Sequence, residues 1–191
     1  MTTRPFVLGL VVLALGVPAC SSGDGKQSTP TSRPRHGPAA SATNVQSRPN
    51  PSAAAKMICS EEASSDIAES LDLRATRVST PVWVDHVYSC NYVYPKGSIK
   101  LSVKDLVSAP ETTAYFSGLA NRLGRARILN GLGQGAFVAK NDDVVARKDD
   151  NVLQVDVQAI PAAANAFLPM MSRSDVALDV AVAILGCWNV G

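Results

Sequence analysis

The 191-residue sequence predicts an α+β domain in which an antiparallel sheet of about five strands is packed on one face by about three helices. Three segments show apolar residues at helical spacing, and short segments rich in β-formers lie between them. Consecutive short strands separated by tight turns favour antiparallel pairing. The expected order is helix, strand, strand, helix, strand, strand, strand, helix.

The first half of this domain is expected to be a helix followed by a hairpin. Acidic residues in 60–62 suit a helix N-terminus, and the apolar spacing continues to Leu71. The segment 82–94 is rich in Val, Trp and Tyr and predicts one strand. A turn at 95–97 leads into 99–103, where apolar and polar residues alternate as in a return strand.

The second half is expected to be a helix, three strands and a final helix. A capping box at 108–111 begins the first of these helices, and Gly124 ends it. Another capping signal at 172–175 precedes a strongly apolar helix over 176–185, which is expected to stop at Gly186. The three strands are expected at 136–138, 144–146 and 153–157.

The N-terminal segment predicts export and a lipid anchor. Arg4 precedes an apolar run, 6–17, that is too short to span a bilayer but fits a signal peptide over 1–19. The sequence Val-Pro-Ala-Cys over 17–20 resembles the bacterial lipobox, which implies cleavage before Cys20 and a diacylglyceryl group on its thiol. The alternative is an ordinary signal peptide in which this cysteine is incidental.

A segment rich in Ser, Pro and Ala over 20–55 predicts a disordered tether between the lipidated cysteine and a globular domain over 56–191. Val45 is the only branched aliphatic residue of the tether and aromatic residues are absent from it, so it cannot bury enough surface to offset the entropy of ordering. The folded part has the length of one domain and can bury a core of its own.

Three further cysteines, Cys59, Cys90 and Cys187, allow one disulfide and leave one thiol. Export favours pairing. The preferred pair is Cys59 with Cys90, which ties the first helix to a strand. A Cys59–Cys187 pair is the rival, and Cys187 is otherwise a free thiol.

The chain resembles small exported lipoproteins of mycobacteria and related actinobacteria that carry a domain of unknown function. The resemblance rests on the lipobox, the tether, Cys59 at the first helix, YSCNY at 88–92, GLGQGAF at 131–137 and VVARKDDNVLQVDV at 144–157. It implies an α+β domain outside the plasma membrane and supplies no catalytic residues. Cys187 is not part of this pattern.

Two motifs that suggest ligand sites are better explained as turns. The glycine-rich segment 131–135 precedes a strand and lacks the lysine of a phosphate loop, so its glycines are expected to serve a turn. The acids Asp142, Asp143, Asp149 and Asp150 are split between two turns and lack calcium-loop spacing, so solvated turns are expected. No metal site and no cofactor is predicted.

No catalytic set is evident in the folded part. His86 is its one histidine and falls within a predicted strand, with no nucleophile-elbow sequence elsewhere. The aromatic residues are candidate ligand contacts, although core packing is the default expectation. They are Trp83, Tyr88, Tyr92, Tyr94 and Trp188.

These observations predict a membrane-anchored extracytoplasmic lipoprotein, located at the outer face of the plasma membrane and acting as a non-catalytic binding or interaction module. The partner would be an envelope protein, a polymer or an apolar ligand. A net charge of only +2 argues against nucleic acid. The alternative is a carrier of a lipid or other apolar small molecule, suggested by the apolar final helix and the pair Met170–Met171. An enzyme using His86 or Cys187 is the least favoured.

Overall fold

A computed structural model describes residues 49–162, 168 and 171–188. The signal peptide, Cys20, most of the tether and Met170 lie outside these residues. The helices are α1 (Ala53–Met57), α2 (Glu61–Leu71), α3 (Ala109–Leu123) and α4 (Arg173–Cys187). The strands are β1 (Arg77–Val78), β2 (Val82–Val84), β3 (Val87–Tyr94), β4 (Gly97–Asp105), β5 (Arg125–Leu129), β6 (Gly135–Ala139), β7 (Val144–Lys148) and β8 (Asn151–Asp156).

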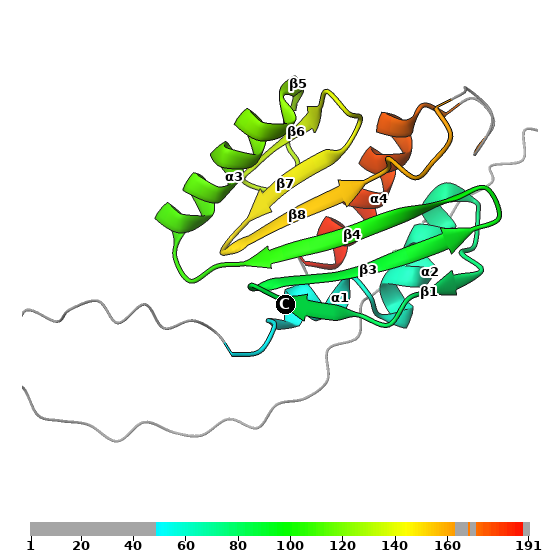
Figure 1. Cartoon of the computed structure of the whole chain (residues 1–191), viewed down its shortest axis with the longest axis horizontal. Helices are drawn as coiled ribbons and strands as arrows, with labels where there is room; N and C mark the ends of the chain where they lie inside the picture. The colour runs from blue at the N-terminus through cyan, green and yellow to red at the C-terminus, as the bar shows by residue number, and fades with distance from the viewer. Residues whose placement is uncertain (1–48, 163–167, 169–170, 189–191) are drawn as a thin grey trace, which may run out of the picture.

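The described strands form one antiparallel sheet in the order β1-β3-β4-β8-β7-β6-β5, and β2 also pairs with β3 (Figure 1). The α+β class and the antiparallel sheet are confirmed. The sheet is larger than expected, with eight strands rather than about five. Four helices are described rather than three.

One predicted strand proved to be a hairpin. Val84 pairs with Val87, and Asp85 and His86 between them both have left-handed backbones, with φ of 50° and 58°. Two consecutive residues with positive φ form the two-residue turn whose twist matches that of paired strands. The prediction of one strand over 82–94 was therefore wrong, because a turn without glycine interrupts a segment of high β-propensity.

The helices cover both faces of the sheet, so the prediction that they lie on one face was wrong (Figure 1). The helices α1, α2 and α4 share a core with one face. Helix α3 packs on the opposite face against Phe137, Val145 and Val152. The side chains of β7 show the reason: Val144 and Ala146 face α4, whereas Val145 faces α3. An uninterrupted apolar run of this kind is typical of a strand that is buried on both faces.

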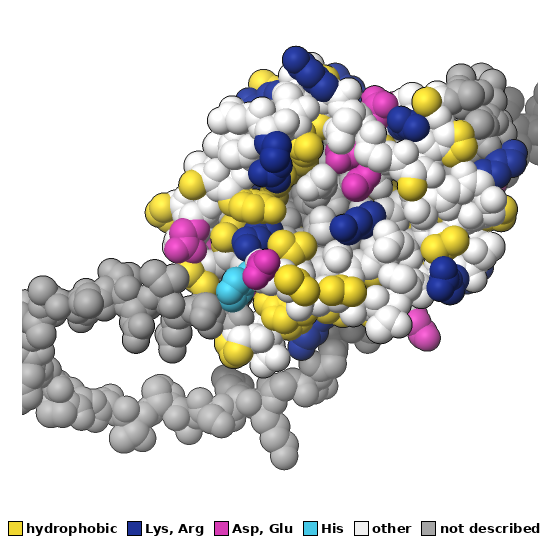
Figure 2. All heavy atoms as spheres, viewed as in Figure 1, with side chains coloured by type: hydrophobic (Ala, Val, Ile, Leu, Met, Phe, Trp, Pro, Cys, Tyr) yellow, Lys and Arg dark blue, Asp and Glu magenta, His cyan; other side chains and the backbone are white. Residues whose placement is uncertain are grey.

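The other half of the sheet is covered on one face only. Along β4, Ile99, Leu101 and Val103 enter the α4-side core, while the lysines and serines between them point away from it. Figure 2 shows this open face, where hydrophobic side chains gather over β2 and β3 and charged groups are scattered. Val82 and Val84 on β2 are 53% and 57% exposed.

Serine caps begin the longer helices where the sequence predicts them. Ser60, Ser108 and Ser172 each accept a hydrogen bond from the backbone N–H three residues later. Ser172 and Asp175 complete a capping box. The last helix continues to Cys187 rather than ending before Gly186. None of the helices in the described residues is long and apolar enough to cross a bilayer.

The chain enters the fold at Ser52. Its backbone N–H donates to Asp105 Oδ2 at 2.6 Å, and its hydroxyl lies 3.4 Å from Asn151 Oδ1. Ser52 also caps α1, in which Ala55 is fully buried. The expected domain boundary at residue 56 thus falls inside α1. Every described core residue lies within 55–187, so the chain from residue 21 onward contains the whole described core.

Candidate functional site

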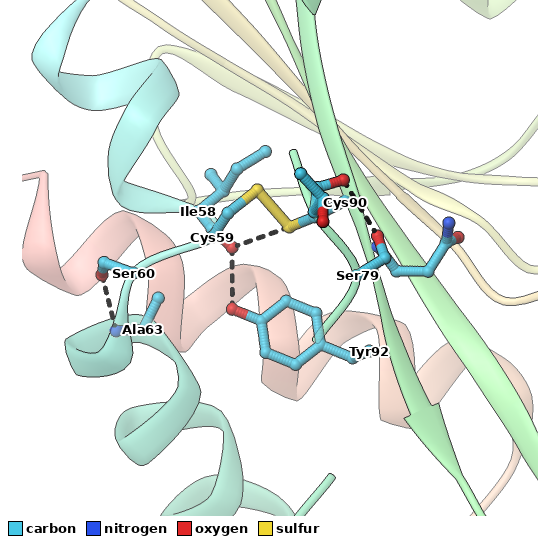
Figure 3. Close-up of a disulfide and its surroundings, with 9 residues drawn as sticks. Ile58, Cys59, Ser60, Ala63, Ser79, Cys90 and Tyr92 are labelled. Carbon is cyan, nitrogen blue, oxygen red and sulfur yellow. Dashed lines mark hydrogen bonds between the residues drawn. A yellow bond between two sulfur atoms is a disulfide. The ribbon is translucent and has the colours of Figure 1, made fainter. Parts of the chain in front are cut away.

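The preferred disulfide is present. Cys59 is bonded to Cys90 with 6.0 Å between their Cα atoms (Figure 3). The bridge joins the segment between α1 and α2 to β3. Beside it, the Tyr92 hydroxyl donates to the Ile58 carbonyl at 2.8 Å, which holds the same segment against the sheet. The arrangement is structural, since both sulfurs are bonded and the neighbouring tyrosine is in the core.

Among the described cysteines, Cys187 is outside the disulfide, and the rival Cys59–Cys187 pair is not formed because Cys59 is bonded to Cys90. Its thiol lies at the end of α4 and donates to Asp66 Oδ2 on α2 at 2.7 Å. The side chain is buried. This contact links the end of α4 to the middle of α2, whereas the one described histidine lies in a hairpin turn.

His86 lies at the tip of the β2–β3 hairpin. Its ring meets Trp83 edge-to-face, with 5.7 Å between centroids. The expectation that His86 lies within a strand was wrong, and it is a half-buried turn residue. Within the described residues, no group of three or more His, Cys, Asp or Glu side chains converges as a metal site would require.

The four acids lie in two turns at opposite ends of β7, as the sequence indicates, but one of them is not solvated. Asp143 is buried and accepts from Gln154 Nε2 at 2.9 Å and from the Val157 N–H at 3.3 Å. Burial, the largest influence, raises the pKa of this carboxyl despite those hydrogen bonds. The prediction of a solvated turn was wrong for Asp143, which fastens the β6–β7 turn to the end of β8.

The aromatic candidates divide into core and surface. Tyr92 and Tyr94 are buried, and burial raises the pKa of Tyr94 to about 12 and that of Tyr92 further. Tyr88 and Trp188 pack half-buried against the core. Trp83 is half-buried on the hairpin. These rings do not converge on one binding surface.

A cleft of about 350 Å³ lies between α3 and the ribbon of β5 and β6. Its apolar surface comes from Phe116 on α3 and from Ile128, Leu129 and Leu132. Ile128 is 60% exposed, the highest value among the exposed large hydrophobic side chains of the described residues. Polar groups are few: Arg125 stands at the start of β5, and Asn130 and Gln134 stand in the loop that follows it. An apolar cleft with a few polar groups is the usual form of a small-molecule site.

The glycine-rich loop forms one end of this cleft. Gly131 and Gly133 have φ of 77° and 58°, conformations that glycine adopts without steric cost. A Cβ on Gly133 would stand 2.5 Å from the Arg147 carbonyl oxygen, so the loop passes directly over β7. These backbone angles support the prediction that the glycines of 131–135 serve a turn. The same loop also forms one wall of the cleft.

Gln134 fixes the loop to the β7–β8 turn. Its backbone N–H donates to the Arg147 carbonyl at 2.7 Å. Its side-chain amide donates to Asp149 Oδ1 at 3.1 Å and accepts from the Asp149 N–H at 3.0 Å. The entry of the chain at Ser52 contacts Asn151, two residues further along the same turn. The loop end of the cleft and the point where the chain enters the fold therefore share one turn.

Two residues that line the cleft, Phe116 and Arg125, contact the buried ring of Phe137. Phe116 meets Phe137 edge-to-face, with centroids 5.3 Å apart. The Arg125 guanidinium lies over the ring of Phe137, at 5.3 Å from the ring centroid. The Arg147 guanidinium lies 6.0 Å from the centroid of the Phe116 ring. Arg147 Nη1 also donates to Thr113 Oγ1 at 2.5 Å, which holds that arginine against α3.

The sequence did not point to this cleft. Residues 125–129 read Arg-Ala-Arg-Ile-Leu, a sequence without apolar alternation, and no strand was predicted there. Comparison with protein-family models, curated proteins and solved structures gave no match for the chain. The site is therefore argued from its own geometry.

Proposed function

We propose that this protein is a lipoprotein anchored through Cys20 at the outer face of the plasma membrane, and that its domain is a non-catalytic binding module with the cleft beside β5 as its site. The observation that carries the binding role is the cleft itself. It combines the exposed Ile128 side chain with the charged Arg125 in a concave surface. A folded domain gains nothing in stability from leaving such an apolar side chain in water.

The positions of the reactive side chains support binding rather than catalysis. A catalytic nucleophile needs both a base within hydrogen-bonding reach and access to its substrate. Here Cys187 is buried against Asp66, and His86 stacks on Trp83 at a hairpin tip. The remaining two cysteines of the domain are joined to each other.

The point of chain entry suits an anchored domain. Ser52 is held by Asp105 and Asn151, so the N-terminal segment leaves the fold from a fixed position. The loop end of the cleft is bonded to the same turn through Gln134 and Asp149. A domain tethered to a membrane from this end would carry the loop end of the cleft near its anchor.

The alternative function, a carrier of a lipid or other apolar small molecule, is favoured by the apolar surface of the cleft. An internal cavity between α4 and the sheet is a less suitable place for a ligand. Val176, Val180 and Ile184 of α4 are almost completely buried there, packed with Leu153 and Val155 of the sheet.

The anchor is tested by the intact mass of the mature protein extracted from membranes. We expect an N-terminus at Cys20 that carries a diacylglyceryl group, and a Cys20→Ala variant that is not processed. A mature chain that begins at Met1, or at an unmodified Ser21, would contradict the lipoprotein proposal.

The binding site is tested by native mass spectrometry of the protein recovered from its envelope in mild detergent. We expect a co-purifying mass that is lost in Gly135→Val. Gly135 lines the cleft, and a Cβ there would stand 3.7 Å from Phe116, in ordinary contact, so the larger side chain fills the cleft without a backbone clash. The same co-purifying mass in the variant would place the site elsewhere.

A further inference from the structure

Arg125 is the charged residue among those that line the cleft, and the acid bonded to a lining residue, Asp149, lies at the loop end. The sequence contains no acidic residue between Glu111 and Asp142, while Arg122, Arg125, Arg127 and Lys140 fall within that interval. Of these four, only Arg125 lines the cleft. At the start of α4, hydrogen bonds from Ser172 lower the pKa of Asp175, and the positive charge of Arg127 contributes to the same shift.

Arg125 is positioned for an external anion. Its guanidinium lies over the ring of Phe137, which orients the group. Within the described part of the chain, it makes no ion pair or hydrogen bond with a carboxylate. An oriented guanidinium presents several donors in a fixed plane, which suits a carboxylate or a phosphate.

The lining of the cleft includes Arg125 at the start of β5 and the glycine-rich loop after the end of β5. Arg125 begins β5 and the glycine-rich loop follows its end, so the two are separated by the length of a five-residue strand, or about 15 Å at about 3.3 Å per residue. Between them lie Ile128 and, from α3, Phe116. A methylene group takes about 30 Å³, as a water molecule does. The cleft volume of about 350 Å³ therefore suits a chain of about a dozen methylene groups.

An edge strand rich in arginine has a simpler explanation, which is protection against pairing with other chains. That explanation accounts for Arg127 and for the register shift between Arg125 and Arg127. It does not account for a concave apolar surface beside the strand. Protection would be stronger if Ile128, which is 60% exposed, were polar.

We propose that the cleft binds a monomeric single-chain anionic amphiphile of about ten to twelve carbon atoms. The anionic head lies on Arg125, and the chain runs past Ile128 and Phe116 toward the glycine-rich loop. This inference rests on the proposed binding function and specifies the ligand class for the same site.

The test uses the chain from residue 21 to 191, which contains the whole described core and lacks the lipidated cysteine. Dodecyl phosphate is titrated below its micelle concentration and followed by calorimetry and by backbone amide NMR shifts. Dodecyltrimethylammonium, with the same chain and a cationic head, is the matched probe. We expect one site per chain, shifts confined to β5, the loop and α3, and at least tenfold weaker binding of the cationic probe.

Two variants and a control locate the two ends of the ligand. Arg125→Gln is expected to weaken dodecyl phosphate binding at least tenfold. Arg122→Gln removes a charge from the same stretch outside the cleft and is expected to leave binding within twofold. Gly135→Val is expected to abolish it. Thermal unfolding of each variant confirms that the fold is retained.

Three results would overturn the inference: equal binding of the two probes, equal effects of the two arginine variants, or binding only to vesicles of phosphatidylglycerol and not to the monomer. The last would indicate a membrane-docking surface. The failure of the proposed function can be told apart from the failure of this inference. The lipoprotein proposal fails if Cys20 is not acylated, whatever the cleft binds. If the envelope-derived ligand has another chemistry and the Gly135→Val variant no longer binds it, only the amphiphile inference is refuted.

Discussion

The two halves of the sheet are built differently. Strands β6 and β7 lie between α3 and the α4-side core, so Phe137 and Val145 are as fully buried as Val144 and Ala146 on the other face. Strands β3 and β4 are covered on one face only, and β4 alternates strictly between core residues and lysine or serine. The covered half is held by packing on two faces. The open half adds a covalent bridge, and its outer face remains available to solvent.

The largest expected effect comes from breaking the two-sided half. Phe137→Ala should lower the free energy of unfolding by about 3–5 kcal/mol, because it removes a fully buried ring that contacts Phe116 and leaves a cavity. Ser102→Ala on the open face is the control and should change it by less than about 0.5 kcal/mol. Denaturant unfolding measures both. Similar costs for the two variants would refute the comparison.

Removing the bridge should destabilise the open half. The double variant Cys59→Ala/Cys90→Ala opens a loop closed by a bond between residues 31 positions apart. The chain-entropy relation gives about 3–4 kcal/mol for a loop of this size. Denaturant unfolding without reductant measures the loss, with Cys187→Ala as the variant that keeps the bridge. Peptide mapping that finds Cys187 in a disulfide would show that the pairing described here is wrong.

The glycine-rich loop of the covered half offers a matched pair of substitutions. Gly131→Ala places a Cβ in open space, so its cost should be that of the left-handed backbone alone, about 1–2 kcal/mol. Gly133→Ala has the same backbone cost and also meets the Arg147 carbonyl. It should cost about 1–3 kcal/mol more. Thermal or denaturant unfolding ranks them, and equal losses would mean that the loop does not pass over β7.

The smallest effect is a dependence on pH at the other end of β7. Burial raises the pKa of Asp143, so the folded chain holds this proton more tightly than the unfolded chain does. Wild-type stability should therefore fall as pH rises through the range above the ordinary pKa of Asp. Asp143→Asn lacks this titration, so its stability relative to wild type should improve as the pH rises above about 4.

Asp142→Asn is the control for that measurement, because Asp142 belongs to the same turn but is only half-buried. Unfolding of the wild type and both variants is compared at each pH. A stability difference between Asp143→Asn and wild type that stays constant with pH, or that favours wild type as pH rises, would refute the assignment.

Local signals in the sequence predict most of the elements. Serine caps locate three helices, and the alternation in β4 shows which residues enter the core. The placement of α3 was mispredicted although the evidence was local, since Val144-Val145-Ala146 lacks the alternation of a strand with one solvated face. Strand β5 was missed because its side chains are mostly exposed, so no buried pattern marks it.

The candidate site was harder to predict because it depends on long-range contacts. The cleft exists because Phe116 on α3 lies beside the β5–β6 ribbon, which begins at Arg125. The periodicity of the sequence does not predict which face of the sheet a helix will cover. The disulfide was predictable as one of the possible pairs, because only three cysteines lie in the folded part. The bond between Asp143 and Gln154 was not, since a turn Asp is usually solvated.

The path from Ser52 to the bridge has a mechanical consequence. A pull on the N-terminal segment loads Ser52 first, then the five-residue helix α1, and then Cys59, where the force passes covalently into β3. Residues 52–58 can unravel into up to about 24 Å of extended chain, at about 3.4 Å per residue. Beyond that point the bridge passes the load into β3 and, through its pairing, into β4. The domain thus has a short extensible segment, residues 52–58, connected in series to a sheet that the bridge holds. Moderate tension would extend this segment and leave the cleft undeformed.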